Sequence, residues 1–311
     1  LQQAMVPEGS TVLDNDWGTA PGCAFQAGGV TVVMLPGPPR ECAAMLRHRA
    51  LPYLAALSDG VIVSRTLKLF GIGESSMEAR LRERMNAMTN PTLAPYAKEG
   101  ETELRITAKA ADARTARALL DPVEAELRAE FGDLIYGVDA ASLEERVLSL
   151  LREQGKTLST AESCTGGLIA KRLTDLAGAS AAFLGGVVSY TNQVKERALG
   201  VPRELLDQYG AVSRPVAEAM ARGVMALTGS DLALSVTGVA GPDRDDRGNP
   251  VGLVYVALTD GERVWVFRGR LGTSRGRVRT MAAHTGLDMV RRYLTGRPVL
   301  ESADGSPAGP G

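Results

Sequence analysis

The chain has 311 residues, 44% of them hydrophobic and 23% charged, as in globular proteins that bury apolar cores. Its net charge of −1 gives the chain as a whole no electrostatic attraction to nucleic acid or to an acidic membrane surface. No apolar run reaches the roughly 18 residues that a membrane-spanning helix needs, so we expect no membrane association. The length suggests two or three domains of roughly 100–200 residues each.

Cysteine and histidine are scarce. The cysteines Cys23, Cys42 and Cys164 do not suggest a disulfide framework, which favours a reducing cytoplasm. The histidines His48 and His284 belong to no cluster of the kind that holds structural zinc. The opening stretch LQQAMVPEGS has no basic segment before an apolar one, so it is not a signal peptide. Because it also lacks an initiator Met, we expect the chain to be a fragment.

Residues 1–60 predict a partial α/β segment. The apolar run 30–35 predicts a buried strand, and 40–57 has the spacing of a helix. Between them, LPGPP (35–39) fixes an extended strand exit, because each proline restricts φ and biases its predecessor away from the helix. This exit is either a structural turn or a ligand-facing loop at the carboxyl end of a strand.

Residues 64–137 predict a small α+β module. Its expected elements are strand 64–71, helix 74–85, strand 102–110 and helix 113–132. We expect the last helix to bend or break near Pro122. The loop GIGE (71–74) resembles the nucleic-acid-binding loop of KH domains but is not basic, and the helices carry the interleaved acids and bases of solvated faces. We therefore rank nucleic-acid binding last and expect a spacer or dimerisation module.

Residues 138–296 show the most regular alternation of elements. The expected helices are 142–155, 165–178, 193–200, 213–229 and 273–296. The expected strands are 156–161, 184–192, 232–240, 252–261 and 263–271, the last two joined by a hairpin turn. Ser142 and Glu145 form a capping box, and Ser213 is a candidate helix cap. This order predicts an α/β sandwich with a mixed sheet, followed by a disordered tail at 297–311.

The stretch TAESCTGG lies where a strand gives way to a helix. It places four polar or reactive side chains in a row: Glu162, Ser163, Cys164 and Thr165. The first N–H groups of a helix are unpaired and carry partial positive charge, so the amides of Thr165, Gly166 and Gly167 could hold an oxyanion. A helix cap with glycines for close packing explains the turn but not the four side chains.

Two nucleophiles compete in this stretch. Ser163 needs a base, because a free hydroxyl is not ionised at neutral pH. Cys164 would react if its pKa fell near the helix start, although a lone cysteine is often a small buried hydrophobe. In SYTNQVK, Lys195 follows Asn192 by three residues, so both can lie on one helical face. A desolvated lysine can serve as the base, and the alternative is a solvated surface lysine.

Two further stretches could line a ligand site. SVTGVAGP leaves its strand at Thr237 and Gly238, and such glycine-rich exits line ligand crevices. GTSRGRVR places Arg275 and Arg279 on one face near a helix start, where they suit either a phosphate or surface salt bridges. The acids of 243–246 could hold a metal, but a solvated turn explains them as well.

Five stretches together resemble the C-terminal domain of the CinA family (competence/damage-inducible protein A). They are TAESCTGG, GGVVSYTNQVKERALGV, GAVSRPVAEAMARG, SVTGVAGP and PVGLVYVAL, in that order within 142–296. The resemblance implies hydrolysis of nicotinamide mononucleotide to nicotinic acid mononucleotide and ammonia, a step of the pyridine nucleotide cycle in NAD metabolism. It also implies a metal-free mechanism with Ser163 as the nucleophile, Lys195 as its base and Tyr190 assisting. The expected substrate-binding residues are Glu162, Thr165, Gly166, Gly167, Asn192, Thr237, Gly238, Arg275 and Arg279.

The front of the chain resembles the same family. NDWGTAPG and LPGPPRE resemble the second half of its molybdopterin-binding-like domain, and 64–137 resembles its KH-like linker module. In the family, the first domain is linked to ADP-ribose pyrophosphatase activity with a divalent metal. The family's opening strands and its GGLGPT-type loop are absent from this sequence, so 1–60 is expected to be a truncated domain without that activity. The amidohydrolase domain is expected at 138–296.

Three functions remain open at this point. The first is the amidohydrolase, for which no cofactor is expected. The second is a non-catalytic nucleotide-binding module. The third is an ADP-ribose pyrophosphatase, which would need a divalent metal and the missing N-terminal half. The expected partners are a small-molecule nucleotide and a second copy of the chain in a homodimer, in the cytoplasm.

Overall fold

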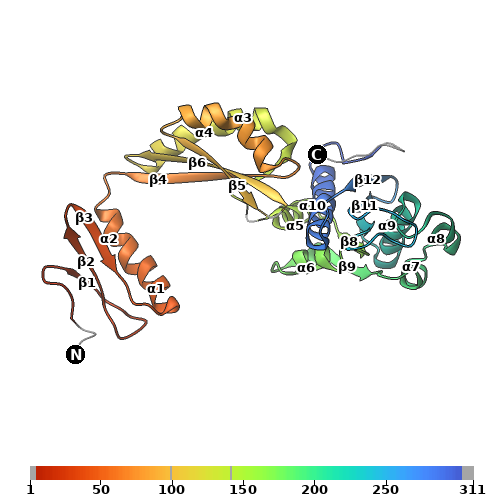
Figure 1. Ribbon diagram of the computed structural model, residues 1–311, viewed down its shortest axis with the longest axis horizontal. Helices are drawn as coiled ribbons and strands as arrows, with labels where there is room; N and C mark the ends of the chain where they lie inside the picture. Colours follow the sequence, from red (N-terminus) through yellow and green to blue (C-terminus); the bar gives the residue numbers. More distant parts are fainter. Residues whose placement is uncertain (1–4, 99, 141, 303–311) are drawn as a thin grey trace. The chain divides into compact units, whose positions relative to one another are not determined.

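The computed structural model describes residues 5–98, 100–140 and 142–302 (Figure 1). The chain divides into two compact units. The first comprises residues up to Ile62 together with Lys109–Ala116, and the second comprises Val63–Ala108 and the chain from Arg117 onward.

The first unit is a small sheet beside one helical stretch. Its antiparallel strands are β1 (Thr11–Leu13), β2 (Gly22–Ala27) and β3 (Val30–Met34). The helical stretch runs through α1 (Pro39–Met45), a π-helical turn (Leu46–Ala50) and α2 (Leu51–Ala56). Strand 30–35 and helix 40–57 were predicted to within one residue, whereas β1 and β2 were not predicted. The prediction that strand 30–35 is buried is wrong, because Val30 and Met34 are exposed and the three residues between them are only partly buried.

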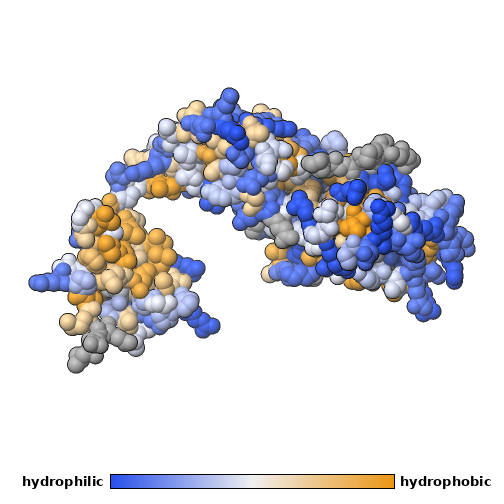
Figure 2. Space-filling model, in the orientation of Figure 1, coloured by the Kyte–Doolittle hydropathy of each residue, from blue (hydrophilic) through white to orange (hydrophobic). Residues whose placement is uncertain are grey.

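The core of this unit is small, and much of its apolar surface is exposed. Its buried residues are Leu13, Ala24, Met45 and Ala50. The large apolar side chains of Leu46, Leu51 and Leu57 are exposed, and Figure 2 shows apolar surface spread over this unit.

The second unit begins with an α+β module of four strands. Its elements are β4 (Val61–Leu69), α3 (Glu74–Ala87), β5 (Thr92–Lys98), β6 (Glu101–Ala110), α4 (Ala113–Phe131) and β7 (Ile135–Val138). The sheet order is β5-β6-β4-β7. The break expected near Pro122 does not occur, because α4 continues through that residue. Ala116, Leu120 and Leu127 are fully buried, and their burial outweighs the hydrogen bond that a proline removes.

The C-terminal domain is an α/β sandwich around a mixed sheet. Its strands are β8 (Leu158–Glu162), β9 (Phe183–Val188), β10 (Leu232–Gly238), β11 (Leu253–Thr259) and β12 (Val264–Arg270). The order is β12-β11-β10-β8-β9, with β8 parallel to both neighbours and β11 antiparallel to both of its own. The predicted fold class and the predicted β11–β12 hairpin are confirmed.

Helices cover this sheet. They are α5 (Leu143–Glu153), α6 (Leu168–Thr174), α7 (Asn192–Leu199), α8 (Arg203–Tyr209), α9 (Arg214–Thr228) and α10 (Arg275–Leu294). Helix α9 packs on β8, β10 and β11, and α10 packs on β10, β11, α5 and α6. Helix α8 was not predicted. Helix α6 is shorter than the predicted 165–178, since Gly166 and Gly167 have positive φ values of 59° and 88°.

Two predictions about element ends have different outcomes. The Ser142 side chain accepts a hydrogen bond from the Glu145 amide at 3.2 Å, as predicted. Ser213 does not cap α9, because its hydroxyl donates instead to the Gly210 carbonyl at 2.8 Å.

The predicted disordered tail includes residues that pack on the domain: Ser302 is buried, and its amide donates to the Val266 carbonyl at 3.0 Å. Residues 303–311 lie outside the described residues.

Candidate active site

The candidate site begins where β8 ends, between its two parallel neighbours. The Ser163 amide donates to the Val236 carbonyl of β10 at 2.9 Å, and the Ser189 amide after β9 donates to the Glu162 carbonyl at 2.8 Å. These bonds hold the carboxyl end of β8 in place. Open α/β sheets bind ligands at such ends, so Ser163 is presented at the position where a ligand is expected.

Lys195 lies beside Ser163. It comes from the first turns of α7, which Thr191 caps by accepting a hydrogen bond from the Val194 amide at 3.4 Å. The Lys195 amine lies 3.1 Å from the Ser163 hydroxyl oxygen and 2.8 Å from the Ser189 carbonyl oxygen. The helix start therefore delivers an amine to a hydroxyl 32 residues earlier in the chain. This distance is within the range for direct proton transfer.

The environment of Lys195 favours the neutral amine. The side chain is 1% exposed, and no ion pair with a carboxylate is found for it among the described residues. Burial lowers the pKa of the Lys195 amine from 10.5 to about 8, because the ammonium form loses its hydration. A lysine with a pKa near neutrality can accept a proton from a serine hydroxyl.

Cys164 is a core residue rather than a thiolate. Its side chain is buried in the main apolar cluster of the domain, beside Leu158 and Ile169. Burial raises the pKa of the Cys164 thiol to about 12, so the thiol stays protonated at neutral pH. Of the two adjacent nucleophiles, the geometry therefore favours Ser163.

Glu162 fixes the start of α6. Its two carboxylate oxygens accept hydrogen bonds from the amides of Ile169 at 3.1 Å and Ala170 at 2.8 Å. The side chain is 1% exposed. Its negative charge sits at the positive end of the helix and satisfies two of the amides that a helix leaves unpaired. Glu162 therefore supports the turn and does not line the cavity.

The turn from 163 to 167 uses some of its amides and leaves others available. The Gly166 amide donates to the Ser163 carbonyl at 3.0 Å, so it is occupied. Within the described part of the chain, no hydrogen bond uses the amides of Cys164, Thr165 or Gly167. Of the predicted oxyanion donors, the Gly166 amide is therefore used within the turn. Cys164, whose amide had not been predicted as a donor, lines the cavity together with Ser163.

A cavity of about 210 Å³ opens beside Ser163. Its predicted lining residues are Ser163, Cys164, Tyr190, Asn192, Lys195, Thr237, Gly238 and Arg275. Thr191, Ala211, Val212 and Ala240 also line it and had not been singled out. Thr191 could have been recognised as a helix cap before Lys195, whereas Ala211 and Val212 carry no signal of their own in the sequence.

Tyr190 and Arg275 form one side of this cavity. Arg275 donates to the Tyr190 hydroxyl at 2.6 Å and to the Gly241 carbonyl at 2.9 Å. Both side chains are exposed. Among the described residues, the Tyr190 hydroxyl has no hydrogen bond with Ser163 or Lys195. A guanidinium held this way presents its remaining donors to an anion at the mouth of the cavity.

Arg279 lies elsewhere than predicted for a phosphate ligand. Its guanidinium donates to the Thr165 carbonyl at 2.7 Å and 3.2 Å, and it does not line the cavity. These two hydrogen bonds of Arg279 link α10 to the turn that carries Ser163. Thr237 is fully buried and donates to the Ala211 carbonyl at 2.7 Å, so that its hydroxyl also braces the cavity wall.

In the acidic loop 243–246, the Asp245 carboxylate makes hydrogen bonds within the loop's own turn. The Asp245 carboxylate accepts hydrogen bonds from the Arg247 amide at 3.1 Å and the Asn249 amide at 2.8 Å. Among the described residues, no group of three or more His, Cys, Asp or Glu side chains has a metal-binding arrangement. None of the helices formed by these described residues is long and apolar enough to cross a membrane.

The fold and the site together define an α/β domain with a buried serine–lysine pair at a strand end. The CinA C-terminal domain model matches residues 140–294, and the damage-inducible protein CinA KH domain model matches residues 64–137. The chain belongs to the CinA family.

Named relatives are similar over most of the chain. The CinA-like protein of Kosmotoga olearia is 45% identical over 294 residues, which are 94% of this chain and 71% of the relative. The CinA-like protein of Desulfovibrio desulfuricans is 47% identical over 99% of this chain and 73% of its own length. The crystal structure of competence/damage inducible protein CihA from Agrobacterium tumefaciens is 41% identical in sequence, with a TM-score of 0.47. The matched part is 49% of this chain and 93% of the CihA chain.

Proposed function

We propose that the chain hydrolyses the carboxamide of nicotinamide mononucleotide to nicotinic acid mononucleotide and ammonia. The observation that carries this proposal is the 3.1 Å approach of the buried Lys195 amine to the Ser163 hydroxyl. A serine with a neutral amine beside it is an activated nucleophile suited to an amide carbonyl. The choice of substrate follows from the resemblance to the CinA C-terminal domain.

In the first half of the reaction, Ser163 is acylated. Neutral Lys195 takes the hydroxyl proton as the serine oxygen attacks the carboxamide carbon. The carbonyl oxygen becomes an oxyanion, and we assign the Cys164 amide as its donor because Cys164 lines the cavity and, among the described residues, no hydrogen bond uses this amide. The lysine then gives its proton to the leaving nitrogen, so that ammonia departs and an ester to Ser163 remains.

In the second half, water cleaves that ester. The same amine, neutral again after ammonia leaves, takes a proton from water, and the hydroxide attacks the ester carbon. The bond to the Ser163 oxygen breaks, and the proton on Lys195 returns to that oxygen. The product carboxylate leaves, and the serine and amine are restored to their starting states.

The substrate phosphate is assigned to Arg275. Its guanidinium is held by Tyr190 at the rim of the cavity, and a cavity of about 210 Å³ is too small to enclose a whole nucleotide. The phosphate would then remain at the exposed mouth, where a guanidinium binds it through paired hydrogen bonds. In this arrangement Tyr190 orients the arginine and assists catalysis indirectly.

Several predictions are kept without further support. The division at 1–60, 64–137 and 138–296, the absence of a cofactor in the amidohydrolase reaction, the homodimer and the cytoplasmic location remain predictions. The non-catalytic nucleotide-binding module is the alternative outcome of the experiment that follows.

Ammonia release from nicotinamide mononucleotide tests the proposal, using the full chain with and without a chelator. We expect activity with chelator present and a loss of at least about a thousandfold in Ser163→Ala. Cys164→Ala is the matched control and should keep most activity, because the thiol is neutral. An unfolding temperature close to that of the wild type shows that each variant is folded. No ammonia from the folded wild-type chain would leave only a binding module, and loss confined to Cys164→Ala would transfer the nucleophile to the cysteine.

A further inference from the structure

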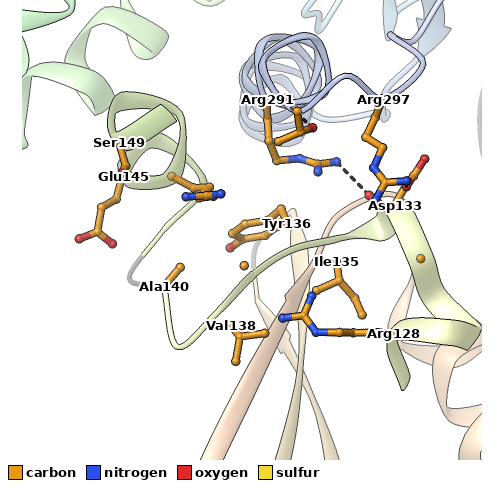
Figure 3. A pocket seen from close by; sticks show the side chains of 14 residues that line it. Arg128, Asp133, Ile135, Tyr136, Val138, Ala140, Glu145, Ser149, Arg291 and Arg297 are labelled. Atoms are coloured by element: carbon orange, nitrogen blue, oxygen red, sulfur yellow. Dashed lines mark hydrogen bonds and ion pairs between the residues drawn. The ribbon is translucent and has the colours of Figure 1, made fainter. Parts of the chain in front are cut away.

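A second and larger cavity lies within the second unit, between the α+β module and the C-terminal domain. Its volume is about 600 Å³, within the range of small-molecule sites. Its walls come from the end of α4, the strand β7, the exposed side of α5 and the end of α10 (Figure 3). It shares no lining residue with the cavity beside Ser163.

Arginines dominate the charge of its walls. The charged residues that line it are Arg128, Arg146, Arg291, Arg297, Asp133 and Glu145. Four guanidinium groups and two carboxylates line the cavity, and three of these guanidinium groups have carboxylate partners outside the lining: Glu124 for Arg128, Glu153 for Arg146 and Asp288 for Arg291. In Figure 3, Arg128 and Arg291 approach Tyr136 from two sides, while the Glu145 carboxylate points away from that ring.

Many N–H groups of Arg128, Arg146 and Arg297 have no hydrogen-bond acceptor among the described residues. Arg128 donates through Nε to Glu124 at 2.7 Å, and no contact of its two terminal nitrogens is found among the described residues. The Arg146 guanidinium lies 3.7 Å from the Glu153 carboxylate, beyond hydrogen-bond distance. Arg297 uses one nitrogen on Asp133 at 3.2 Å. A guanidinium has five N–H groups, so three arginines here can still donate to a ligand.

Arg291 contributes a guanidinium held in a fixed position to the wall of the same cavity. It is 4% exposed and donates to the Asp288 carboxylate at 2.7 Å and to the Asp133 carbonyl at 2.9 Å. The strand β7 adds an apolar surface through Ile135 and Val138 and the ring of Tyr136. A ligand that fits both features has a multiply charged anionic end and a less polar body.

We propose that this cavity binds a phosphorylated small molecule of nucleotide size, separate from the catalytic site. Guanidinium groups bind phosphate oxygens through paired hydrogen bonds, and several of them converge here from three helices and a loop. The phosphates would lie among Arg128, Arg146 and Arg297, and the nucleoside would lie against the β7 side chains. Helix α10 borders both cavities, with Arg275 at one end and Arg291 near the other.

Calorimetric titration of the full chain with ADP, pyrophosphate and adenosine tests the proposal. We expect ADP and pyrophosphate to bind and adenosine to bind at least about tenfold more weakly. Arg128→Gln and Arg146→Gln should each weaken ADP binding about tenfold, since each removes a charged donor. Arg203→Gln, in α8 and outside both cavities, is the matched control and should leave ADP binding unchanged. Unfolding temperatures show that the variants are folded.

Three outcomes would overturn this assignment. Absence of ADP and pyrophosphate binding at millimolar concentration is the first. The second is ADP binding that is equal in wild type, Arg128→Gln and Arg146→Gln. The third is ADP binding lost in Arg275→Gln but kept in Arg128→Gln, which would place the nucleotide in the catalytic cavity. None of these outcomes depends on amidohydrolase activity, so this test and that of the proposed function fail separately.

Discussion

Ser163 and Cys164 are neighbours in the chain with different surroundings. Both line the cavity, but the Ser163 hydroxyl lies 3.1 Å from the Lys195 amine, whereas the Cys164 side chain belongs to the apolar core and its pKa is raised to about 12. The sequence could not decide between them, because burial depends on which strands and helices close over each side chain. It did predict that a lysine 32 residues later could be the base, since SYTNQVK places Lys195 one turn into a helix.

The rate should rise with pH in the range where Lys195 loses its proton. With a pKa of about 8, about one tenth of the chains have the neutral base at pH 7 and about nine tenths at pH 9. We expect kcat/KM to rise roughly tenfold per pH unit below 8 and to level off above it. Initial rates of ammonia release from pH 6 to 9.5 measure this profile. A profile that is flat from pH 6 to 9 would exclude this lysine as the base.

Lys195 should also change stability with pH. Because the folded state lowers its pKa from 10.5 to about 8, the unfolded chain binds more protons between these values, and the free energy of unfolding rises with pH there. The shift corresponds to about 3 kcal/mol. Lys195→Met should lack this rise and be more stable than wild type at pH 7 while inactive. Urea unfolding at pH 7 and 10 measures both effects. An equal rise in the two proteins would contradict the buried-amine interpretation.

Among the elements, long amphipathic or apolar segments were predicted well and short edge segments were not. Strand β8 lies within two residues of its predicted bounds and helix α7 within one, whereas α6 is shorter than predicted at both ends and β9 ends four residues before the predicted 192. Strands β1 and β7 were missed because three or four residues give no clear periodicity. Strands β2 and β5 were missed as well, although they have six and seven residues, and Pro95 inside β5 argues against a strand from sequence alone. The position of Arg279 was also missed, since one helical face can reach either a phosphate or a backbone carbonyl.

Close packing of α7 on α9 holds Lys195 in place. A Cβ atom added at Gly223 of α9 would lie 1.9 Å from the Leu199 carbonyl oxygen at the end of α7. Gly223→Ala must therefore push α7 away and carry the Lys195 amine from Ser163. We expect a loss of about 1–3 kcal/mol in stability and a fall in kcat. Thermal unfolding and ammonia release measure these two effects.

Gly276→Ala is the matched control for this substitution. Gly276 lies in α10, and a Cβ atom added there meets nothing within 4 Å. Because alanine favours the helix, we expect unchanged or slightly higher stability. Equal unfolding temperatures for Gly223→Ala and Gly276→Ala would show that the contact between α7 and α9 is not tight.

At the scale of the whole molecule, α10 connects the α+β module to the C-terminal domain. Buried Asp288 pairs with Arg291 at 2.7 Å and with Arg292 at 2.8 Å, and Arg291 in turn binds the Asp133 carbonyl. Asp288→Asn leaves two arginines without their carboxylate, so we expect a loss of about 3–5 kcal/mol. Hydrogen exchange should speed up in 132–138 first. Asp207→Asn, at an exposed pair with Arg203, should cost less than about 1 kcal/mol. Equal losses in the two variants would contradict this role of Asp288.

The position of Ser163 depends on a strand that is synthesised much later. Its amide bonds to Val236, and β8 pairs with β10 from Leu158↔Leu232 onward, so more than 70 residues separate the partners. A nascent chain that has left the ribosome only as far as α9 already carries both Ser163 and Lys195, but nothing yet holds one edge of β8. The arrangement of Ser163 beside Lys195 is therefore completed only once β10 has emerged.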